Sequence, residues 1–168
     1  MTFEFSCASC GEIHRGMPGF GARAPLSYYL IPAEERDARC SLGSDDCVID
    51  EEFFFIHGCV EIPVHGEEEP FSWGVWVSLS KKSFTQWAAC YDEKERAHIG
   101  PFFGWLNAAL RPYPETAGLK TQVYLRNDGI RPYIEIEPID HPLAVEQREG
   151  ISVARVAEIY AQIMHEKN

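Results

Sequence analysis

The sequence predicts an α+β fold in which an antiparallel sheet of about four strands carries helices packed on one face. Apolar and polar residues alternate in four segments that form two hairpin-like pairs. Segments with helical periodicity lie between and after these pairs, which is the element order of an α+β domain. No strand-helix-strand unit with a glycine-rich turn occurs, so a doubly wound nucleotide-binding fold is not expected.

The chain length suits one domain spanning residues 1–168. Within it, we expect an irregular metal-knuckle region at 1–50 and an α+β core at 51–168. The first region is rich in Gly and Pro and has one short helical segment, over 32–39. Pro32 suits the first turn of that helix because its missing N–H has no partner there in any case.

The first predicted hairpin joins strands at 53–62 and 73–79 through a polar connection at 63–70. Gly58 interrupts the alternation of the first strand and is therefore a candidate β-bulge. After this hairpin, Ser80 is a predicted N-cap because its hydroxyl can accept a hydrogen bond from the first turn of a helix.

Three helices are predicted in the core region. The first follows Ser80 at 81–91, and the second covers 101–110 and ends before Pro112. The third runs from its N-cap at Ser152 to about residue 165, with an apolar stripe at helical spacing.

The second predicted hairpin lies between the last two helices. Its strands cover 119–126 and 133–137, and the turn contains Asn127 and Gly129, which favour positive φ angles. Pro132 cannot donate to a ladder, so the return strand is expected to begin at a sheet edge or to form one.

Composition excludes several classes of protein. The net charge is −11, with 26 acidic residues against 15 lysines and arginines, which argues against nucleic-acid binding. The longest apolar run, 53–56, is far too short to span a membrane, and no secretory signal is visible, so we expect a cytoplasmic protein. The acidic runs are expected to be solvated turns, or else a face for a basic protein partner.

The sharpest local motif is a pair of cysteines, Cys7 and Cys10, followed by His14. Cysteines at this spacing can bind one metal ion from a tight turn, and zinc prefers four such sulfur and nitrogen ligands. Cys47 is the first choice for the fourth ligand and Cys40 the second. The rival interpretations are a pair of free thiols and a redox pair.

A second polar cluster contains Glu135, Glu137 and His141. Two carboxylates on one strand face, followed by a histidine, could form an acid-base set or a hard-metal site. The simpler interpretation is the solvated face of an antiparallel strand followed by a turn.

Several stretches together resemble an uncharacterised prokaryotic family, domain of unknown function 2199. The stretches are 7–14, 46–50, 73–80, 103–106 and 140–151. The likeness covers almost the whole chain and implies a bacterial single-domain protein, but no activity.

The resemblance also groups particular residues. It draws Cys7, Cys10, His14 and Cys47 together as one set, in agreement with the proposed zinc ligands. It further implies that His141, Glu146 and Gln147 are either binding residues or residues that cap the last helix and tie it to the sheet.

The sequence therefore favours a binding or interaction protein stabilised by a structural zinc ion over an enzyme. One alternative is a metal-dependent hydrolase that uses an open metal position or the cluster of Glu135, Glu137 and His141. A further alternative is a thiol-redox protein acting through Cys7 and Cys10.

Overall fold

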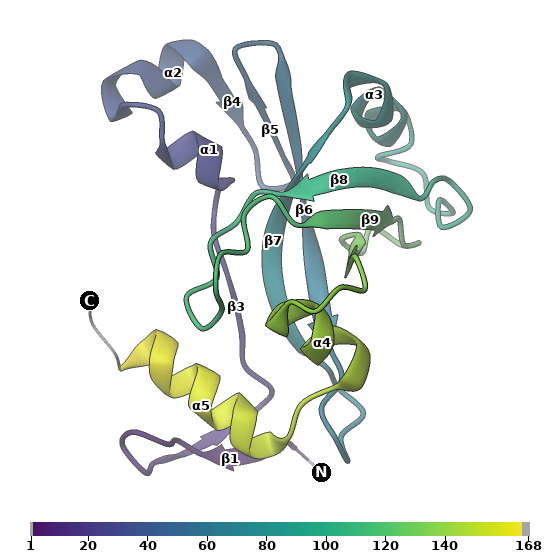
Figure 1. Cartoon of the computed structure of the whole chain (residues 1–168). Coiled ribbons are helices and arrows are strands. Elements are labelled where there is room, and N and C mark those ends of the chain that lie inside the picture. The colour runs from purple at the N-terminus through teal and green to yellow at the C-terminus, as the bar shows by residue number, and fades with distance from the viewer. Residues whose placement is uncertain (1, 166–168) are drawn as a thin grey trace.

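The computed structural model describes residues 2–165, and five strands in it close into a barrel (Figure 1). The barrel strands are β6 (Phe53–Ile62), β7 (Phe71–Leu79), β8 (Phe102–Leu106), β9 (Lys120–Tyr124) and β10 (Tyr133–Ile136). In this order, each strand pairs antiparallel with the next one. The ring closes where β10 pairs parallel with β6, so the barrel is mixed.

The predicted antiparallel sheet of four strands with helices on one face is therefore wrong. Both predicted hairpins are present, but the segment predicted as a helix at 101–110 contains β8. Phe102, Gly104 and Leu106 are buried, whereas Phe103 and Trp105 are 44% and 47% exposed. This period of two, with aromatic residues that favour strands, is the pattern of a barrel wall.

Gly58 is not a bulge, because the pairing of β6 with β7 continues through Gly58 and Val75. A Cβ atom at Gly58 would lie 2.6 Å from Cδ1 of Ile134, which belongs to β10. The glycine therefore makes room for a side chain of the strand that closes the barrel. Pro132 precedes β10, and its carbonyl accepts a hydrogen bond of 2.8 Å from the Cys59 amide. β10 has a partner on both sides, so it is not an edge strand.

The region predicted as irregular at 1–50 contains short strands and helical turns. A separate hairpin is formed by β1 (Glu4–Ser6) and β2 (Ile13–Arg15). β3 (Gly19–Gly21) adds to β7, whereas β5 (Asp46–Ile49) adds to β6 and β4 (Cys40–Leu42) adds to β5. The helical pieces are α1 (Leu26–Tyr29), η1 (Ala33–Glu35) and α2 (Arg36–Arg39).

Three longer helices lie outside the barrel: α3 (Lys81–Ala89), α4 (Pro142–Glu149) and α5 (Val153–Met164). Ser80 and Ser152 are the N-caps of α3 and α5, as predicted, and each hydroxyl accepts a backbone N–H at 3.1 Å. α5 lies against the β1–β2 hairpin, so the first hairpin and the last helix lie together at one end of the molecule (Figure 1).

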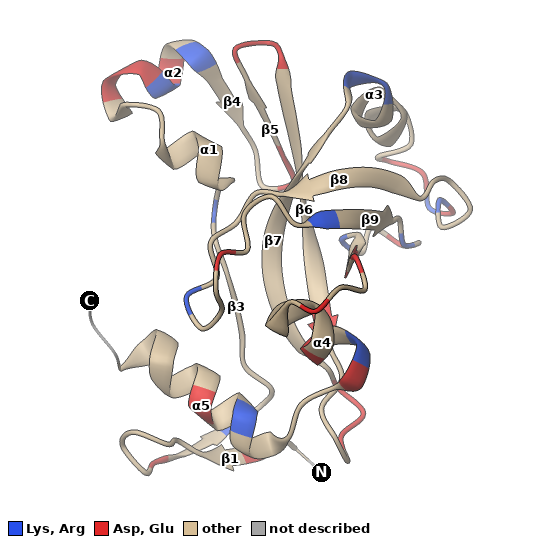
Figure 2. Cartoon of the chain, in the orientation of Figure 1, with Lys and Arg blue, Asp and Glu red and all other residues tan. Residues whose placement is uncertain are grey.

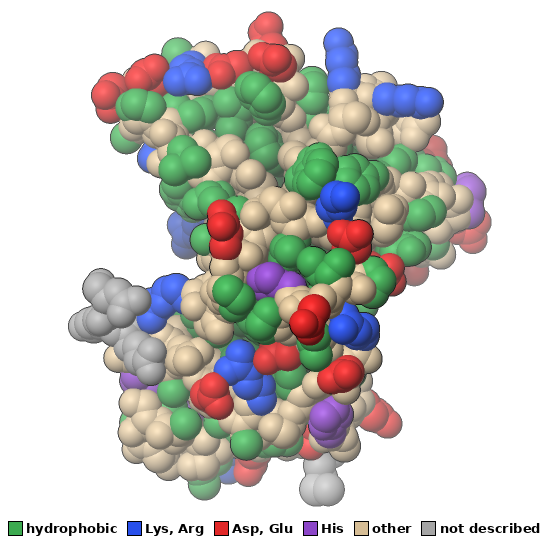
Figure 3. All heavy atoms as spheres, viewed as in Figure 1, with side chains coloured by type: hydrophobic (Ala, Val, Ile, Leu, Met, Phe, Trp, Pro, Cys, Tyr) green, Lys and Arg blue, Asp and Glu red, His purple; other side chains and the backbone are tan. Residues whose placement is uncertain are grey.

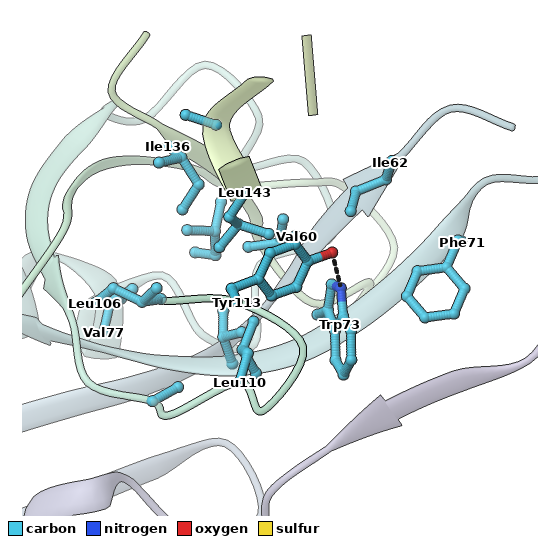
Figure 4. Close-up of a cluster of buried hydrophobic side chains, with 14 of the residues drawn as sticks. Val60, Ile62, Phe71, Trp73, Val77, Leu106, Leu110, Tyr113, Ile136 and Leu143 are labelled. Carbon is cyan, nitrogen blue, oxygen red and sulfur yellow. Dashed lines mark hydrogen bonds between the residues drawn. The ribbon is translucent and has the colours of Figure 1, made fainter. Parts of the chain in front are cut away.

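The main core fills the barrel and the space beneath α4. Trp73 is 2% exposed and donates a hydrogen bond of 3.3 Å from Nε1 to the Tyr113 hydroxyl (Figure 4). This pairing satisfies a buried polar group inside an apolar cluster. A second cluster covers the outer face of β6 and β7. Its buried members are Ile31, Cys47, Ile49, Phe55 and Trp76.

Charged side chains are unevenly distributed over the surface. Acidic residues gather at the end of the molecule that carries η1, α2 and the turn between β5 and β6 (Figures 2 and 3). These residues are Glu34, Glu35, Asp37, Asp50, Glu51 and Glu52. No helix within residues 2–165 has the length and apolar character needed to cross a bilayer.

Candidate functional site

The cysteine knuckle is the turn that joins β1 to β2. The Cys7 amide donates a hydrogen bond of 2.8 Å to the Glu12 carbonyl, and the Gly11 amide donates one of 3.0 Å to the Cys7 carbonyl. Gly11 has a φ of +74°, where a residue without Cβ fits best. Cys7 is buried and Cys10 is exposed, so one thiol faces the protein and the other faces solvent.

His14 lies on β2, opposite Phe5 of β1. Its ring centroid is 4.4 Å from that of Tyr160 on α5 and 5.3 Å from that of Phe5. The Nε2 atom of His14 is buried and has no hydrogen-bond partner among the described residues. A buried polar atom without a partner is costly, which suggests that something absent from the protein chain completes it.

His165 brings a further nitrogen to the knuckle from the C-cap of α5. The ligand atoms of Cys7, Cys10 and His165 all lie within 4.8 Å of one another, as do those of Cys10, Glu12 and His14. Ligand atoms of a tetrahedral zinc site are roughly 3.4–3.8 Å apart. The two groups share Cys10, so Cys7, Cys10 and His165 form one candidate set of zinc ligands and His14 is a further candidate beside Cys10. Cysteine and histidine donors suit that metal.

The pKa of the Cys7 thiol is lowered. The main cause is a hydrogen bond from the Cys10 backbone amide to the sulfur; burial acts in the opposite direction, and the Ser9 amide lowers the pKa further. Because the thiolate is the form that binds metals and attacks disulfides, this environment suits either chemistry.

The structure does not bring Cys47 to the knuckle. Cys47 lies on β5, at the opposite end of the molecule from β1 (Figure 1), and packs with Phe55 and Trp76. Burial is the main cause that raises its thiol pKa to about 12. Cys40, the second choice, lies in the neighbouring strand β4 and packs against the same cluster. Of the predicted ligand set, Cys7 and Cys10 lie together with His165, and His14 has its ligand atom within 4.8 Å of that of Cys10.

A hollow of about 490 Å³ lies on another side of the barrel. In it, Asp45 accepts hydrogen bonds from the Tyr91 hydroxyl at 2.5 Å and from Arg131 Nε at 3.0 Å. Arg96, only 3% exposed, also lines the hollow. Sequence patterns gave no indication of this cluster because Asp45, Arg131 and the pair Tyr91 and Arg96 come from three separate loops.

A sequence model of a family described as "Uncharacterized protein conserved in bacteria (DUF2199)" matches residues 6–151, well over half of the chain. The chain belongs to this family. No curated protein and no solved structure matches the DUF2199 chain significantly. Its site must therefore be interpreted from its own residues.

In this DUF2199 chain, His141 is the N-cap of α4. Its Nδ1 accepts the Leu143 amide at 3.1 Å, so Nε2 carries the proton and donates to the Glu115 carbonyl at 3.0 Å. Both ring nitrogens are therefore engaged. Glu135 and Glu137 are exposed on the outer side of the barrel.

Glu146 and Gln147 connect α4 to its neighbours. Glu146 accepts hydrogen bonds from Arg155 of α5 at 2.7 Å and from the Tyr113 hydroxyl at 2.6 Å. Burial, followed by this carboxylate, raises the Tyr113 pKa. The side chain of Gln147 bonds to the backbone of β10, accepting from Ile136 N and donating to Ile134 O, each at 2.8 Å. These contacts tie α4, rather than the last helix α5, to the sheet, and Glu146 joins α4 to α5.

Asp45 provides a pH-dependent prediction. Burial raises the pKa of this carboxyl, but hydrogen bonds from Tyr91 and Arg131 outweigh burial, so the pKa lies below its usual value. A carboxyl whose pKa is lower in the folded state than in the unfolded state stabilises the fold at pH values above its unfolded-state pKa, which is near 4. This stabilisation is lost as the pH falls through the folded-state pKa. Asp45→Asn is expected to cost about 1 kcal/mol at pH 7 and less in acid. Urea unfolding of both proteins at pH 7 and at the lowest pH where both remain folded tests this. A cost that does not change with pH would contradict it.

Proposed function

We propose that this DUF2199 protein is a binding or interaction protein whose two chain ends are fastened together by a structural zinc ion. The observation that carries the proposal is a pair of ligand-atom groups at the knuckle that share Cys10, one with Cys7 and His165 and the other with Glu12 and His14, each within 4.8 Å. The buried Nε2 of His14, which has no partner among residues 2–165, gives independent support.

Four protein ligands make a closed zinc site, which stabilises structure and leaves no position for a substrate. In this position the ion would link the turn between β1 and β2 to the end of α5. Phe5, His14 and Tyr160 already pack around this junction, with ring centroids 4.4–5.3 Å apart. The junction is thus partly formed by packing, and the metal would complete it.

The hydrolase alternative receives less support. Its proposed acid-base residue, His141, uses both ring nitrogens in hydrogen bonds to the backbone, so it has no free nitrogen for a proton transfer. The thiol-redox alternative is favoured by one observation, the lowered pKa of Cys7 beside Cys10. It is kept as the second candidate.

A basic protein partner would find its complement at the acidic end of the molecule, where η1, α2 and the turn from β5 to β6 carry six acids (Figure 2). Charge of one sign at one end increases the rate of encounter with a partner of opposite charge. This partner is part of the proposal and is separate from the metal site.

Metal analysis tests the zinc site. Protein purified without chelator or metal resin is expected to contain about one zinc per chain, lost in Cys10→Ser and His165→Ala. Cys47→Ala is the matched control and should keep the metal, because Cys47 lies at the other end of the barrel. Removing zinc is expected to lower the free energy of unfolding by about 3–4 kcal/mol, the effect of a ligand present at several hundred times its Kd.

Two results would contradict the zinc proposal. Loss of zinc in Cys47→Ala but not in His165→Ala would restore the original ligand set. Wild-type protein without metal, with a thiol that reacts rapidly at neutral pH, would favour the redox alternative.

A further inference from the structure

A second hollow, of about 480 Å³, forms a groove along the outer face of β6 and β7 beside β3. Its volume is in the range of small-molecule sites. The residues that matter for its chemistry are Arg23, His57, Cys59, Ser72, Gly74 and Arg131. None of these belongs to the zinc knuckle, which precedes β3 in the sequence.

The charge of this groove is opposite to that of the chain as a whole. The protein has 26 acidic residues and 15 basic ones, yet two arginines and no carboxylate line the groove among the described residues. Arg23 is exposed and makes no ion pair or hydrogen bond within residues 2–165. A locally cationic hollow in an acidic protein favours a negatively charged ligand.

Arg131 is held in position while part of its guanidinium remains available. Its Nε donates to Asp45 Oδ1 at 3.0 Å, and Asp45 is in turn bonded to the Tyr91 hydroxyl. In the described part of the chain, neither terminal nitrogen of Arg131 has a hydrogen-bond partner. A guanidinium anchored through Nε can present its two terminal groups to a phosphate or carboxylate.

His57 adds a hydrogen-bond acceptor to the groove. Its ring is stacked on Trp76, with centroids 4.7 Å apart and planes 7° apart, and its Nδ1 lies 3.1 Å from the Ser44 carbonyl. A carbonyl can only accept, so Nδ1 carries the proton and Nε2 presents a lone pair. Burial lowers the His57 pKa, which favours this neutral form.

Gly74 keeps the acceptor of His57 accessible. A Cβ atom at Gly74 would lie 3.1 Å from His57 Nε2 and 3.5 Å from the Gly21 Cα. The absence of a side chain therefore leaves Nε2 facing the groove and lets β3 approach β7. A ligand with a hydroxyl group could donate to Nε2, while its anionic group lies near the arginines.

The neighbouring hollow limits where the anionic group can lie. His57 and Arg131 border both hollows, but carboxylates of Asp45, Asp92, Glu93 and Asp128 line the neighbour beside Lys94 and Arg96. No carboxylate among the described residues lines the groove, so an anion is better placed at its arginine end.

We propose that this groove binds a small hydroxylated organic anion, whose phosphate or carboxylate lies between Arg23 and Arg131 and whose hydroxyl donates to His57 Nε2. This is a binding site distinct from the zinc knuckle, so either proposal can fail without the other. A sugar phosphate and a sugar acid both combine an anionic group with hydroxyl groups, and the experiment below distinguishes them.

The test is an NMR titration of the full-length, ¹⁵N-labelled protein with glucose 6-phosphate, gluconate, inorganic phosphate and glucose. We expect glucose 6-phosphate or gluconate to shift the amide signals of Gly21, Arg23 and Gly74 at lower concentrations than either inorganic phosphate or glucose. Whichever of the two binds more tightly identifies the anionic group.

Arg23→Gln is the decisive variant, because Arg23 is exposed and makes no hydrogen bond or ion pair with the residues that the structure describes. We expect it to weaken binding at least tenfold. Lys82→Gln, which removes one positive charge from the exposed start of α3, should leave affinity within twofold of wild type. His57→Phe retains a flat ring on Trp76 and is expected to reduce the preference for the hydroxylated anion over inorganic phosphate.

Three results would overturn the proposal: no shift of groove amides with either organic anion, wild-type affinity in Arg23→Gln, or equal binding of inorganic phosphate and the organic anions. Zinc content measured on the same samples keeps the two sites apart. If fully metal-loaded protein does not bind the anion, only the groove proposal is contradicted. If protein purified without metal binds the anion, only the zinc proposal is contradicted.

Discussion

Replacing Gly58 with valine is expected to lower the free energy of unfolding by about 3–5 kcal/mol, the range of severe overpacking in a core. A Cβ at this position would meet the Ile134 side chain at 2.6 and 2.7 Å and the Pro132 carbonyl at 3.0 Å. The side chain of Ile134 can rotate, but the carbonyl belongs to the backbone that closes the barrel. The two branches of valine would therefore push β10 away from β6.

Urea unfolding measures this effect, and a double variant tests its cause. Gly58→Ala should be destabilising. Elsewhere in a strand, replacing glycine with alanine usually stabilises the fold, because alanine lowers the conformational entropy of the unfolded chain. Adding Ile134→Val removes the nearest atom, so the double variant Gly58→Ala with Ile134→Val should lose less than the sum of the two single effects. Additive effects would show that the Cβ does not contact Ile134.

Arg96→Lys is expected to cost about 2–4 kcal/mol although it preserves the charge. Arg96 donates from Nε to Arg126 O at 2.9 Å, from Nη1 to Tyr91 O at 3.0 Å and from Nη2 to Ile130 O at 3.1 Å. One planar guanidinium thus joins the segment after α3 to the turn between β9 and β10. An ammonium group cannot reach three carbonyls in these directions, and partly buried acceptors would lose their donors.

The matched control is Arg148→Lys. Arg148 also donates to a backbone carbonyl, that of Ile139 at 2.8 Å, but it does so at the surface, where water can replace it. We expect this variant to lie within about 0.5 kcal/mol of wild type by urea unfolding. Equal costs for the two lysine variants would show that the fork geometry of Arg96 is unimportant.

Local patterns predicted the hairpins and the caps because those features depend on neighbours in sequence. Ser80 and Ser152 each bond to an amide three residues later, which sequence spacing reveals directly. The strand β8, at 102–106, was missed because the stretch 101–110 was predicted as one helix that ends before Pro112. The alternation of Phe102, Gly104 and Leu106 contained the correct period, but five residues give a weak signal.

The candidate site was predictable only in part. Cys7, Cys10 and His14 share a hairpin, so their spacing was informative. His165 comes from the far end of the chain, and only the packing of α5 on β1 brings it to Cys7 and Cys10. Cys47 follows a polar turn, but in β5 it shares a buried face with Ile49 while Asp46 and Val48 are only half-buried, so its side chain packs in an apolar cluster. The groove could not be predicted from the sequence, because Arg23 and Arg131 are far apart in the chain and line one hollow only in the folded protein.

The parallel pairing of Cys59 with Tyr133 has a consequence for how the protein folds. The hairpins β6–β7 and β9–β10 join strands that follow one another, so each can form early with a small loss of chain entropy. Closure of the ring joins β6 to β10, and the whole of β7, β8 and β9 lies between them in sequence. Such long-range pairing is characteristic of slow folding, so closure of the barrel is expected to limit the folding rate. Until it occurs, β10 and the part of β6 beyond the residues paired with β5 have an unpaired edge, which is a place where aggregation can begin.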